Sequence, residues 1–355
     1  MRTRAAVVAG LGGYLPPHVV TNKMLAEQLD TSDEWIYSRT GIRQRHVVSA
    51  GMATSDLAVE AGRRALASAA ATGTATATAT ANMVILATTT PDYPCPASAP
   101  DIAFRLGLGP VPAFDVSAVC AGFVYALGVG AGAISAGLAE RVLVIGAEAF
   151  TSIIDPRDRT TAPIFGDGAG AVVLRAGERT EPGALLAFDL GSDGHLKDLI
   201  RVPAGGSRQR LTEAVPDPRD YYFAMQGKAV FKNAVQHMTA SLQAALRSAG
   251  WGLDEIDWLV GHQANVRILQ LLADQLGVRR EQAVVNIDSV GNTSAASIPL
   301  MLADGTAAGT FAVGDKIALT AFGGGLAWGS VVLTWPRIEL AGAPRDAVES
   351  ISQPA

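Results

Sequence analysis

The sequence predicts an α/β protein made of two halves that repeat the same order of elements. In each half a short apolar strand leads into a turn with a polar residue, and a helix rich in small residues follows. Each half then ends with a strand, a turn of the form Phe-Gly-x-Gly and a strand containing Val-Val-Leu. Helices that alternate with buried strands are typical of parallel or mixed sheets. We therefore expect an internal duplication of one α/β unit.

The N-terminal half is expected to span residues 1–177. A polar, basic loop at 40–46 is either a solvated surface or a functional segment, and the sequence favours neither. An Ala/Thr-rich stretch at 71–81 is expected to be a loose connection. A proline-rich loop at 91–100 contains Cys95. From the apolar periodicity we expect strands at 7–13, 83–88, 111–116, 141–147 and 171–174, and helices at 22–29, 55–70, 101–106 and 121–139 with another starting in 31–36.

The C-terminal half is expected to span residues 223–336, after a connecting segment at 178–222 that is richer in proline, glycine and charge. The polar tail at 341–355 is expected to be flexible. The expected elements are strands at 258–260, 283–287, 316–320 and 329–333 and helices at 228–249 and 294–303.

Composition limits the function. Hydrophobic residues make up 49% of the 355 residues and charged residues 17%, which indicates a large core. The net charge of −5 and the absence of a dense basic run argue against nucleic-acid binding, and no apolar run is long enough to span a membrane. The two cysteines, Cys95 and Cys120, are too few for a disulfide framework, so we expect a cytoplasmic protein.

Cys120 lies where a predicted strand turns into a helix. The free N–H groups and the dipole of a helix N-terminus stabilise a thiolate, which is the nucleophilic form of cysteine. Most lone cysteines are nevertheless buried structural residues. The prediction of a nucleophile therefore depends on what the other turns carry.

Two further turns carry polar groups at strand ends. His262 follows the strand at 258–260, and Asn292 follows the strand at 283–287 at the position that Cys120 occupies in the first half. Each alone is more often structural, but in a duplicated fold these strand ends converge. The three residues fit a hydrolase in which histidine activates the thiol, or an acyl-transfer site in which two neutral donors stabilise an oxyanion or enolate. The order of the residues does not choose between them.

Over roughly residues 7–333 the chain resembles the β-ketoacyl-acyl carrier protein synthase III family of the thiolase superfamily. The resemblance rests on several motifs that occur together. These motifs are Thr31-Ser32-Asp33-Glu34-Trp35-Ile36, Arg39-Thr40-Gly41-Ile42-Arg43, Cys120-Ala121-Gly122-Phe123, Phe165-Gly166-Asp167-Gly168-Ala169-Gly170-Ala171, His262-Gln263-Ala264-Asn265, Gly291-Asn292-Thr293-Ser294-Ala295-Ala296-Ser297 and Phe322-Gly323-Gly324-Gly325.

The resemblance implies a thiolase-like fold with five layers, α-β-α-β-α, in a homodimer. It implies that Cys120 takes the acyl group from acyl-CoA, with the amides of Cys120 and Gly324 as oxyanion hole. His262 and Asn292 would hold the thioester carbonyl of a malonyl unit as it loses carbon dioxide. Acyl-CoA enters as a substrate, and no metal or other cofactor is implied.

The resemblance also implies substrate contacts. Trp35 and Arg39 match the family's clamp on the adenine of coenzyme A, with Thr31 and Arg159 beside it. The expected pantetheine path consists of Phe231, Asn265 and Ile268, together with Lys228 where the family usually has asparagine. Phe322 is expected next to Cys120 in the acyl pocket.

Two departures from the family pattern bear on specificity. Cys95 matches a position in the loop that the partner subunit inserts into the acyl pocket, where a bulky aromatic residue is frequent, so we expect a roomier pocket. Lys232 and Arg267 match basic residues that dock the acidic carrier protein. Asp274 and Gln275 stand where a lysine pair is frequent, which weakens electrostatic steering and suggests a different carrier or acceptor.

The expected function is a decarboxylating Claisen condensation of an acyl-CoA primer, loaded on Cys120, with malonyl-acyl carrier protein to start fatty-acid or polyketide synthesis. The alternative is an acyltransferase that moves the acyl group from Cys120 to another acceptor without condensation. A non-catalytic partner subunit is disfavoured because Cys120 is retained. A hydrolase is disfavoured because a narrow apolar tunnel excludes water.

Overall fold

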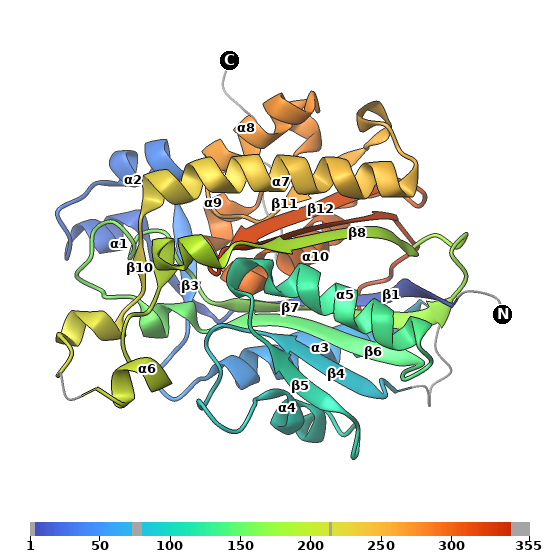
Figure 1. The fold of residues 1–355 in the computed structure, drawn as a ribbon, viewed down its shortest axis with the longest axis horizontal. Coiled ribbons are helices and arrows are strands. Elements are labelled where there is room, and N and C mark those ends of the chain that lie inside the picture. The colour runs from blue at the N-terminus through green and yellow to red at the C-terminus, as the bar shows by residue number, and fades with distance from the viewer. Residues whose placement is uncertain (1–3, 73–79, 213–214, 342–355) are drawn as a thin grey trace.

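The computed structural model describes residues 4–72, 80–212 and 215–341. Two sheets are stacked with helices between them and on both outer faces (Figure 1). Helices α3 (Thr54–Ala71) and α4 (Ala99–Arg105) cover one outer face, and α7 (Gly227–Ala249) with α8 (Val266–Leu276) covers the other. The expected five-layered α-β-α-β-α arrangement is confirmed.

The first sheet has five strands in the order β1-β7-β6-β4-β5. Strand β4 is parallel to both β5 and β6, whereas β7 is antiparallel to β6 and to β1, so the sheet is mixed as expected. Strand β5 lies at an edge and pairs only with β4 in the described part of the chain. The bounds are β1 (Ala5–Tyr14), β4 (Met83–Ala87), β5 (Ala113–Val116), β6 (Arg141–Glu148) and β7 (Gly168–Gly177).

The second sheet has the order β11-β12-β13-β8 and repeats the plan of the first. Strands β8, β13, β12 and β11 take the places of β1, β7, β6 and β4, with the same parallel and antiparallel pairings. The duplication is therefore visible in the strand order. The bounds are β8 (Leu185–Ser192), β11 (Trp258–Gly261), β12 (Lys316–Gly323) and β13 (Ala327–Thr334).

Two expectations for the second half need correction. The expected strand at 283–287 is reduced to a bridge between Ala283 and Leu259, after which the short helix α9 (Ile287–Val290) begins. The segment 178–222 does more than connect the halves, because it contains β8, and the second half therefore begins before residue 223. As a half-exposed edge strand, β8 lacks the continuous apolar run that identifies a buried strand.

The polar segment 40–46 is not simply a solvated loop. It contains strand β3 (Gln44–Val47), which pairs with β2 (His18–Thr21), and Arg45 is buried with a relative exposure of 1%. The Arg45 guanidinium donates hydrogen bonds to the carbonyls of Val20 and Pro163. Burial lowers the pKa of Arg45 to about 10.

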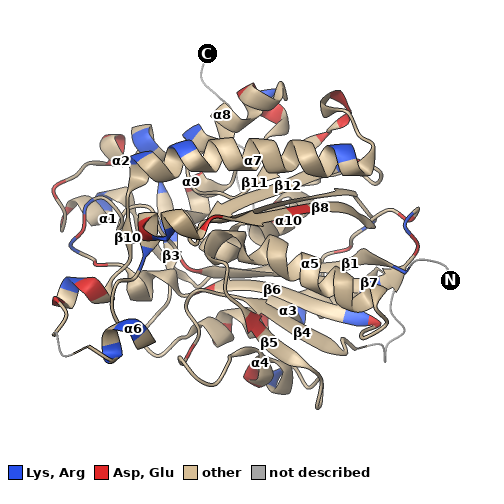
Figure 2. Ribbon diagram, in the orientation of Figure 1, with Lys and Arg blue, Asp and Glu red and all other residues tan. Residues whose placement is uncertain are grey.

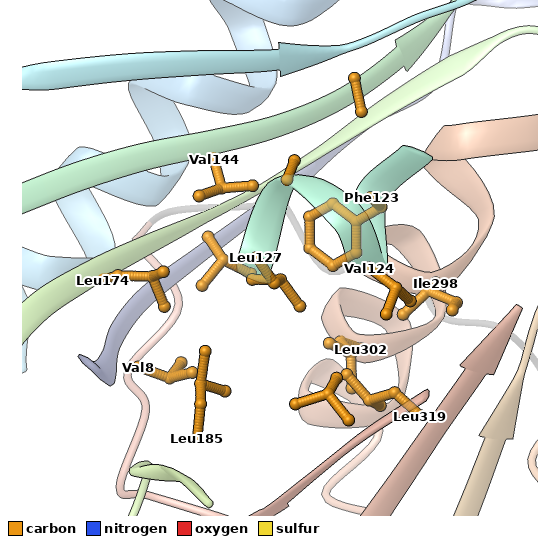
Figure 3. Close-up of a cluster of buried hydrophobic side chains, with 14 of the residues drawn as sticks. Val8, Phe123, Val124, Leu127, Val144, Leu174, Leu185, Ile298, Leu302 and Leu319 are labelled. Atoms are coloured by element: carbon orange, nitrogen blue, oxygen red, sulfur yellow. The ribbon is translucent and has the colours of Figure 1, made fainter. Parts of the chain in front are cut away.

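The central layer between the sheets consists of α5 (Gly122–Ser135) and α10 (Ser297–Ala307), each preceded by a single 3-10 turn. Figure 3 shows the core that surrounds them, in which Phe123 and Leu127 of α5 lie near Ile298 and Leu302 of α10. Each sheet also packs on its outer helices through one further hydrophobic cluster. The two sheets thus enclose the helices that begin at the turns expected to be reactive.

The remaining elements are short. The helices are α1 (Asn22–Ala26), α2 (Asp33–Thr40) and α6 (Ser207–Arg210), and the two-residue strands β9 (Ile200–Arg201) and β10 (Ala224–Met225) pair with each other. The 3-10 turns are η1 (Val119–Ala121), η2 (Phe150–Ile153), η3 (Gly194–Leu199), η4 (Pro218–Tyr221), η5 (Leu253–Glu255), η6 (Arg280–Gln282) and η7 (Ser294–Ala296).

Two expectations concern residues outside the described ranges. Most of the Ala/Thr-rich stretch, 73–79, and most of the polar tail, 342–355, lie there. In the described ranges, none of the helices is both long and apolar enough to cross a membrane.

Candidate active site

Cys120 lies in η1, between the end of β5 and the start of α5. Val119 has a positive φ of 47°, an unusual conformation for a β-branched residue that turns the chain sharply before the cysteine. The turn packs tightly on β12, since a Cβ atom on Gly323 would lie 2.7 Å from the Cys120 nitrogen. We call residues 117–121 the cysteine turn.

The equivalent turn in the second half, residues 292–296, is called the asparagine turn. Here η7 follows α9 and Ser294 has a positive φ of 48°, which aligns it with Val119. The residue equivalent to Cys120 is therefore Ala295. Our expectation that Cys120 and Asn292 occupy the same position is wrong by three residues, because the sequence showed the common turn but not its register.

The side chains of Cys120, His262 and Asn292 line one cavity, as expected. Its other walls are almost entirely apolar, so the cavity is a place where a thioester can react away from water. They consist of Phe165, Ile200, Phe223, Met225, Val230, Ala234, Met238, Ala264, Ile268 and Phe322.

His262 is held in one orientation by Ser297. The His262 Nδ1 atom lies 2.6 Å from the Ser297 hydroxyl oxygen, which also accepts a weak bond from the Gln263 N–H at 3.4 Å. The donor and acceptor roles depend on the tautomer; we assign the Ser297 proton to the bond with Nδ1, which places the ring proton on Nε2. Burial lowers the pKa of His262 to about 3, so the ring is neutral. In this tautomer the ring can donate a hydrogen bond from Nε2.

Asn292 is oriented by its own turn. Its Oδ1 atom accepts a hydrogen bond of 2.9 Å from the Ser294 N–H, which leaves the Nδ2 group free to donate. Its backbone is fixed by hydrogen bonds with Ile164 and Gly166. The asparagine turn thus presents a second neutral donor beside His262.

The thiol of Cys120 is not stabilised as a thiolate at rest. Burial, followed by the charge of Glu148, raises its pKa to about 12, although a hydrogen bond with Ser294 acts in the opposite direction. The helix N-terminus that the sequence suggested does not outweigh burial between two sheets. In the described ranges, no hydrogen bond joins Cys120 to His262, which argues against a thiol–imidazole pair of the hydrolase type.

Of the residues expected to bind adenine, Trp35 and Arg39 lie on α2, Thr31 precedes this helix, and Arg159 reaches the Trp35 ring from a distant segment. The guanidinium groups of Arg39 and Arg159 lie 4.6 Å and 5.3 Å from the centre of the Trp35 ring. Arg159 also forms an ion pair of 2.8 Å with Asp30. The Thr31 hydroxyl is buried without a hydrogen-bond partner in the described structure. The cluster is compact, with both cations stacked on one indole.

Of the residues expected along the pantetheine path, one lines the cavity and the others lie outside it. Ile268 lines the cavity, while the Asn265 side chain caps α8 through the Arg267 N–H and donates to the Arg39 carbonyl at 2.9 Å. Phe231 lies in a groove on the outer face between α7 and α8, and Lys228 is exposed in the first turn of α7.

The remaining expected residues are placed as follows. Phe322 lines the cavity beside Cys120, whereas Cys95 is exposed and does not line it. Lys232 lies in the same outer groove as Phe231, and Arg267 donates to the Ser38 carbonyl at 2.5 Å. Gly324 follows β12 next to the cysteine turn.

Sequence reasoning missed three polar residues around the site. Ser294 and Ser297 lie within the Asn292 motif but were not given roles, because their effect depends on which atoms they contact. Glu148 ends the apolar strand β6 and is completely buried. A charged residue that ends an apolar strand was the signal that could have identified it.

Comparison with known proteins identifies the family. Two family models match the chain, described as 3-oxoacyl-[acyl-carrier-protein] synthase III at residues 114–194 and its C-terminal part at residues 246–335. β-Ketoacyl-[acyl-carrier-protein] synthase III 3 of Streptomyces coelicolor is 58% identical over 95% of this chain and 99% of its own. The synthase III of Pseudomonas aeruginosa strain LESB58 is 52% identical over 94% and 98%.

Solved structures that resemble this chain include members of the same family. The synthase III of Pseudomonas aeruginosa PAO1 has a TM-score of 0.87 at 51% identity, over 95% of this chain and 100% of that one. The priming β-ketosynthase of the R1128 polyketide pathway has a TM-score of 0.86 at 32% identity, over 94% and 97%. With the fold and the cysteine, histidine and asparagine in one cavity, these similarities show that the chain belongs to the β-ketoacyl-[acyl-carrier-protein] synthase III family of the thiolase superfamily.

Proposed function

We propose that this protein condenses an acyl-CoA primer with malonyl-acyl carrier protein, with loss of carbon dioxide, to give a 3-oxoacyl-acyl carrier protein. The observation that carries the proposal is the pair of neutral donors, His262 Nε2–H and Asn292 Nδ2–H, in one apolar cavity with Cys120. Simple acyl transfer needs a nucleophile and an oxyanion site, and a second set of donors is the requirement of an enolate. The enzyme class is a condensing acyltransferase.

In the first step Cys120 attacks the thioester carbonyl of acyl-CoA and releases the CoA thiol. The amides of Cys120 and Gly324 are the proposed oxyanion hole. Both amides lie at the cysteine turn, since a Cβ atom on Gly323 would lie 2.7 Å from the Cys120 nitrogen and one on Gly324 would lie 3.1 Å from the Val119 side chain. Preorganised N–H donors of this kind stabilise a tetrahedral oxyanion without reorganisation.

In the second step the thioester carbonyl of the malonyl unit accepts hydrogen bonds from His262 and Asn292. Loss of carbon dioxide leaves an enolate whose oxygen these donors stabilise, and its carbon attacks the acyl group on Cys120. No base has to remove a proton from the malonyl carbon, which agrees with a His262 that is neutral and whose pKa burial lowers to about 3.

The adenine of coenzyme A is proposed to bind at Trp35, Arg39 and Arg159. Guanidinium groups that already stack on the indole can part to admit a nucleobase, which provides a similar planar surface. Thr31 has a buried hydroxyl without a partner beside this cluster and offers a hydrogen bond to the ligand. Lys228, Phe231, Asn265 and Ile268 are proposed to follow the pantetheine arm.

We propose that two copies pair through β5. This edge strand is only half-buried, as an edge awaiting a partner would be. The loop containing Cys95 is anchored beside it, since the carboxylate of Asp115 in β5 accepts hydrogen bonds from the N–H groups of Ser98 and Ala99. Pairing at β5 would carry Cys95 of one copy toward the acyl pocket of the other, where its small size leaves room for a longer primer.

The carrier protein is proposed to dock near α7 and α8. Figure 2 shows basic residues on the end of α7 beside α2, and Lys232 is exposed there, with Arg267 at the start of α8. Asp274 is paired with Arg280 at 2.7 Å, so its charge is partly neutralised. The remaining basic residues suit an acidic partner with moderate electrostatic steering. The unpaired cysteines suit a cytoplasmic location.

Intact-mass spectrometry tests the proposal. The protein is incubated with acyl-CoAs of increasing chain length and then with malonyl-acyl carrier protein. We expect Cys120 to gain the acyl mass and to lose it when the malonyl carrier is added, with formation of a 3-oxoacyl carrier. An acyl-enzyme that malonyl carrier leaves unchanged would support the alternative, an acyltransferase without condensation. If acetyl-CoA is strongly preferred over acyl-CoAs with C4–C8 chains, the prediction of a roomier acyl pocket is wrong.

A further inference from the structure

Arg45 in β3 is a buried cation to which the proposed reaction gives no role. It is 1% exposed, and none of the ion pairs in the described structure includes it. Its Nε–H group is also buried without a hydrogen-bond partner in that structure. Burying a charge without an opposite charge is costly, so the position of Arg45 calls for an explanation.

The two terminal nitrogens of the guanidinium hold three separate segments. Nη1 donates to the Val20 carbonyl of β2 at 3.0 Å, and Nη2 donates to the Pro163 carbonyl at 2.7 Å. Nη2 also donates to Oδ1 of Asn22, the first residue of α1, at 2.8 Å. Arg45 thus joins β2 and α1 to residues 159–166, which we call the Arg159 segment.

The first of these links leads to the proposed adenine site. Asn22 extends it, because its Nδ2 group donates to Oδ1 of Asp33 at 2.8 Å. Asp33 is the first residue of α2, the helix that carries Trp35. From the opposite side, the Arg159 segment places the Arg159 guanidinium 5.3 Å from the centre of the Trp35 ring. Arg45 is therefore connected to both groups of this cation–π pair.

The second link leads to the asparagine turn. The Asn292 N–H donates to the Ile164 carbonyl at 2.9 Å, and the Gly166 N–H donates to the Asn292 carbonyl at 3.0 Å. The backbone of β3 lies against the same place, since Cβ atoms on Gly166 and Gly291 would each lie 3.0 Å from the Arg45 Cβ atom. The Arg159 segment is therefore fixed to Arg45 at one point and to Asn292 at the next.

We propose that Arg45 is a positioning residue that holds the adenine site and the asparagine turn in one arrangement, through the Arg159 segment that both share. Arg45 does not line the cavity of Cys120, so it acts through the segments that it binds. A lysine at this position would keep the charge but would lack the planar fork that reaches three acceptors at once. The inference rests on the proposed roles of Trp35 and Asn292.

The first test measures the adenine site. Acylation of Cys120 is followed with acyl-CoA and with acyl-pantetheine, which lacks the adenine nucleotide, and the ratio of the two kcat/KM values gives the contribution of the adenine site. With Arg45→Lys we expect this ratio to fall about tenfold. A smaller fraction of folded enzyme would lower both values equally. The ratio therefore does not respond to a loss of stability alone.

The second test measures the asparagine turn. The rate of carbon dioxide release from malonyl-acyl carrier protein is divided by the rate of Cys120 acylation by acyl-pantetheine, a step that uses neither Asn292 nor the adenine site. With Arg45→Lys we expect this ratio also to fall about tenfold. The proposal requires both ratios to fall, and a parent value for either one would overturn it. A parent protein that is never acylated would instead show failure of the proposed function.

Arg64→Lys is the matched control. The Arg64 guanidinium donates to the Gly13 carbonyl at 2.7 Å and lies 5.2 Å from the centre of the Tyr14 ring, without contact to either subsite. Both ratios should keep their parent values in this variant. If Arg45→Lys fails to fold, Asn22→Ala removes the connection to α2 and should lower the adenine ratio a few-fold; an unchanged ratio would overturn the proposal.

Hydrogen exchange tests the same connection without substrate. Mass spectrometry of the free protein compares peptides that cover residues 159–166 and 287–293 with peptides from the rest of the chain. With Arg45→Lys we expect exchange to become about tenfold faster in these two ranges and to change little in β12. Unchanged exchange in both ranges, or equally faster exchange throughout, would overturn the proposal. No acyl-CoA or carrier is used, so this result stands even if the proposed function fails.

Discussion

The cysteine turn and the asparagine turn share a backbone but differ in chemistry. Each is a 3-10 turn that begins at a residue with positive φ, 47° at Val119 and 48° at Ser294, and each leads into a helix of the central layer. The first turn presents its thiol one residue after this point, and the second presents its amide two residues before it. Duplication supplied two similar frames, and different positions of each frame became reactive.

The comparison extends to how burial affects the two turns. Burial opposes the charged form of Cys120 and raises its pKa to about 12. The same surroundings suit the asparagine turn, because Asn292 is neutral and a buried His262 is kept neutral. In the proposed reaction, one half therefore provides a nucleophile that must be activated, and the other provides donors that are ready at rest.

The largest effect should follow from removing the nucleophile of the cysteine turn. We expect Cys120→Ala to lower acylation by acyl-CoA at least about a thousandfold, since no other group in the cavity is a comparable nucleophile. Intact-mass spectrometry measures the acyl-enzyme directly. Cys95→Ser serves as control and should still be acylated. Acyl mass on the Cys120→Ala protein would refute the assignment.

A somewhat smaller effect should follow from changing the donor of the asparagine turn. Asn292→Asp replaces the Nδ2 donor with an oxygen of similar size, and we expect condensation to fall about 100-fold to 1000-fold. Acylation of Cys120 should change only a few-fold, because the amide is not used in that step. Single-turnover assays separate the two steps. An equal loss in both would mean that the two turns do not divide the work.

His262 should also leave a signature in stability. Its pKa in the fold is lowered from the ordinary 6.5 to about 3, so the unfolded chain binds a proton below about pH 6.5 that the folded chain does not. Stability is therefore lost as the pH falls through this window, by about 2 kcal/mol at pH 5. His262→Gln should lack this loss. Urea unfolding of both proteins at pH 7.5 and pH 5 measures the change in the free energy of unfolding. An equal change in the parent protein and in His262→Gln would contradict the prediction.

Ser297 is the hydrogen-bond partner of His262 Nδ1, and its removal should have a modest effect. With Ser297→Ala we expect condensation to fall about tenfold, since His262 loses the hydrogen bond that directs its proton to Nε2. Acylation should be nearly unchanged. The ¹⁵N chemical shifts of the imidazole report the tautomer independently of activity. A variant with an unaltered tautomer would show that Ser297 is not needed for it.

The smallest effect is expected on the outer surface. Gln275→Lys adds positive charge beside Lys232 and should increase kcat/KM for the malonyl carrier a few-fold at low salt. The gain should vanish at high ionic strength, because screening removes long-range steering. Gln243→Lys, elsewhere in the same groove, provides a positional control. A gain that persists at high salt would indicate a direct contact instead.

The five layers followed from the family resemblance. The sequence was sufficient to predict that Cys120, His262 and Asn292 meet, because apolar runs precede all three, although the run before Asn292 forms only a bridge followed by α9. It was not sufficient for their ionisation. The pKa of Cys120 depends on burial by both halves and on Glu148, which is 28 positions away along the chain. Long-range packing of this kind has no local signature.

Two other limits of the sequence have similar causes. Strand β8 (Leu185–Ser192) was taken as part of a connection, because an edge strand with one exposed face resembles a loop in composition. The loop at 40–46 could have been a solvated surface, whereas Arg45 lies in the interior, where backbone carbonyls from distant segments accept its hydrogen bonds. In both cases the structure is determined by contacts between residues that are far apart in the sequence.

The most direct test of the division of labour is to measure two partial reactions in two variants. Cys120 acylation is followed by intact mass, and decarboxylation of malonyl-acyl carrier protein by release of carbon dioxide. We predict that Cys120→Ala still releases carbon dioxide but is not acylated, whereas Asn292→Asp is acylated but does not release carbon dioxide. If each variant loses both reactions, the two turns act as one unit, and the division of labour between them is contradicted.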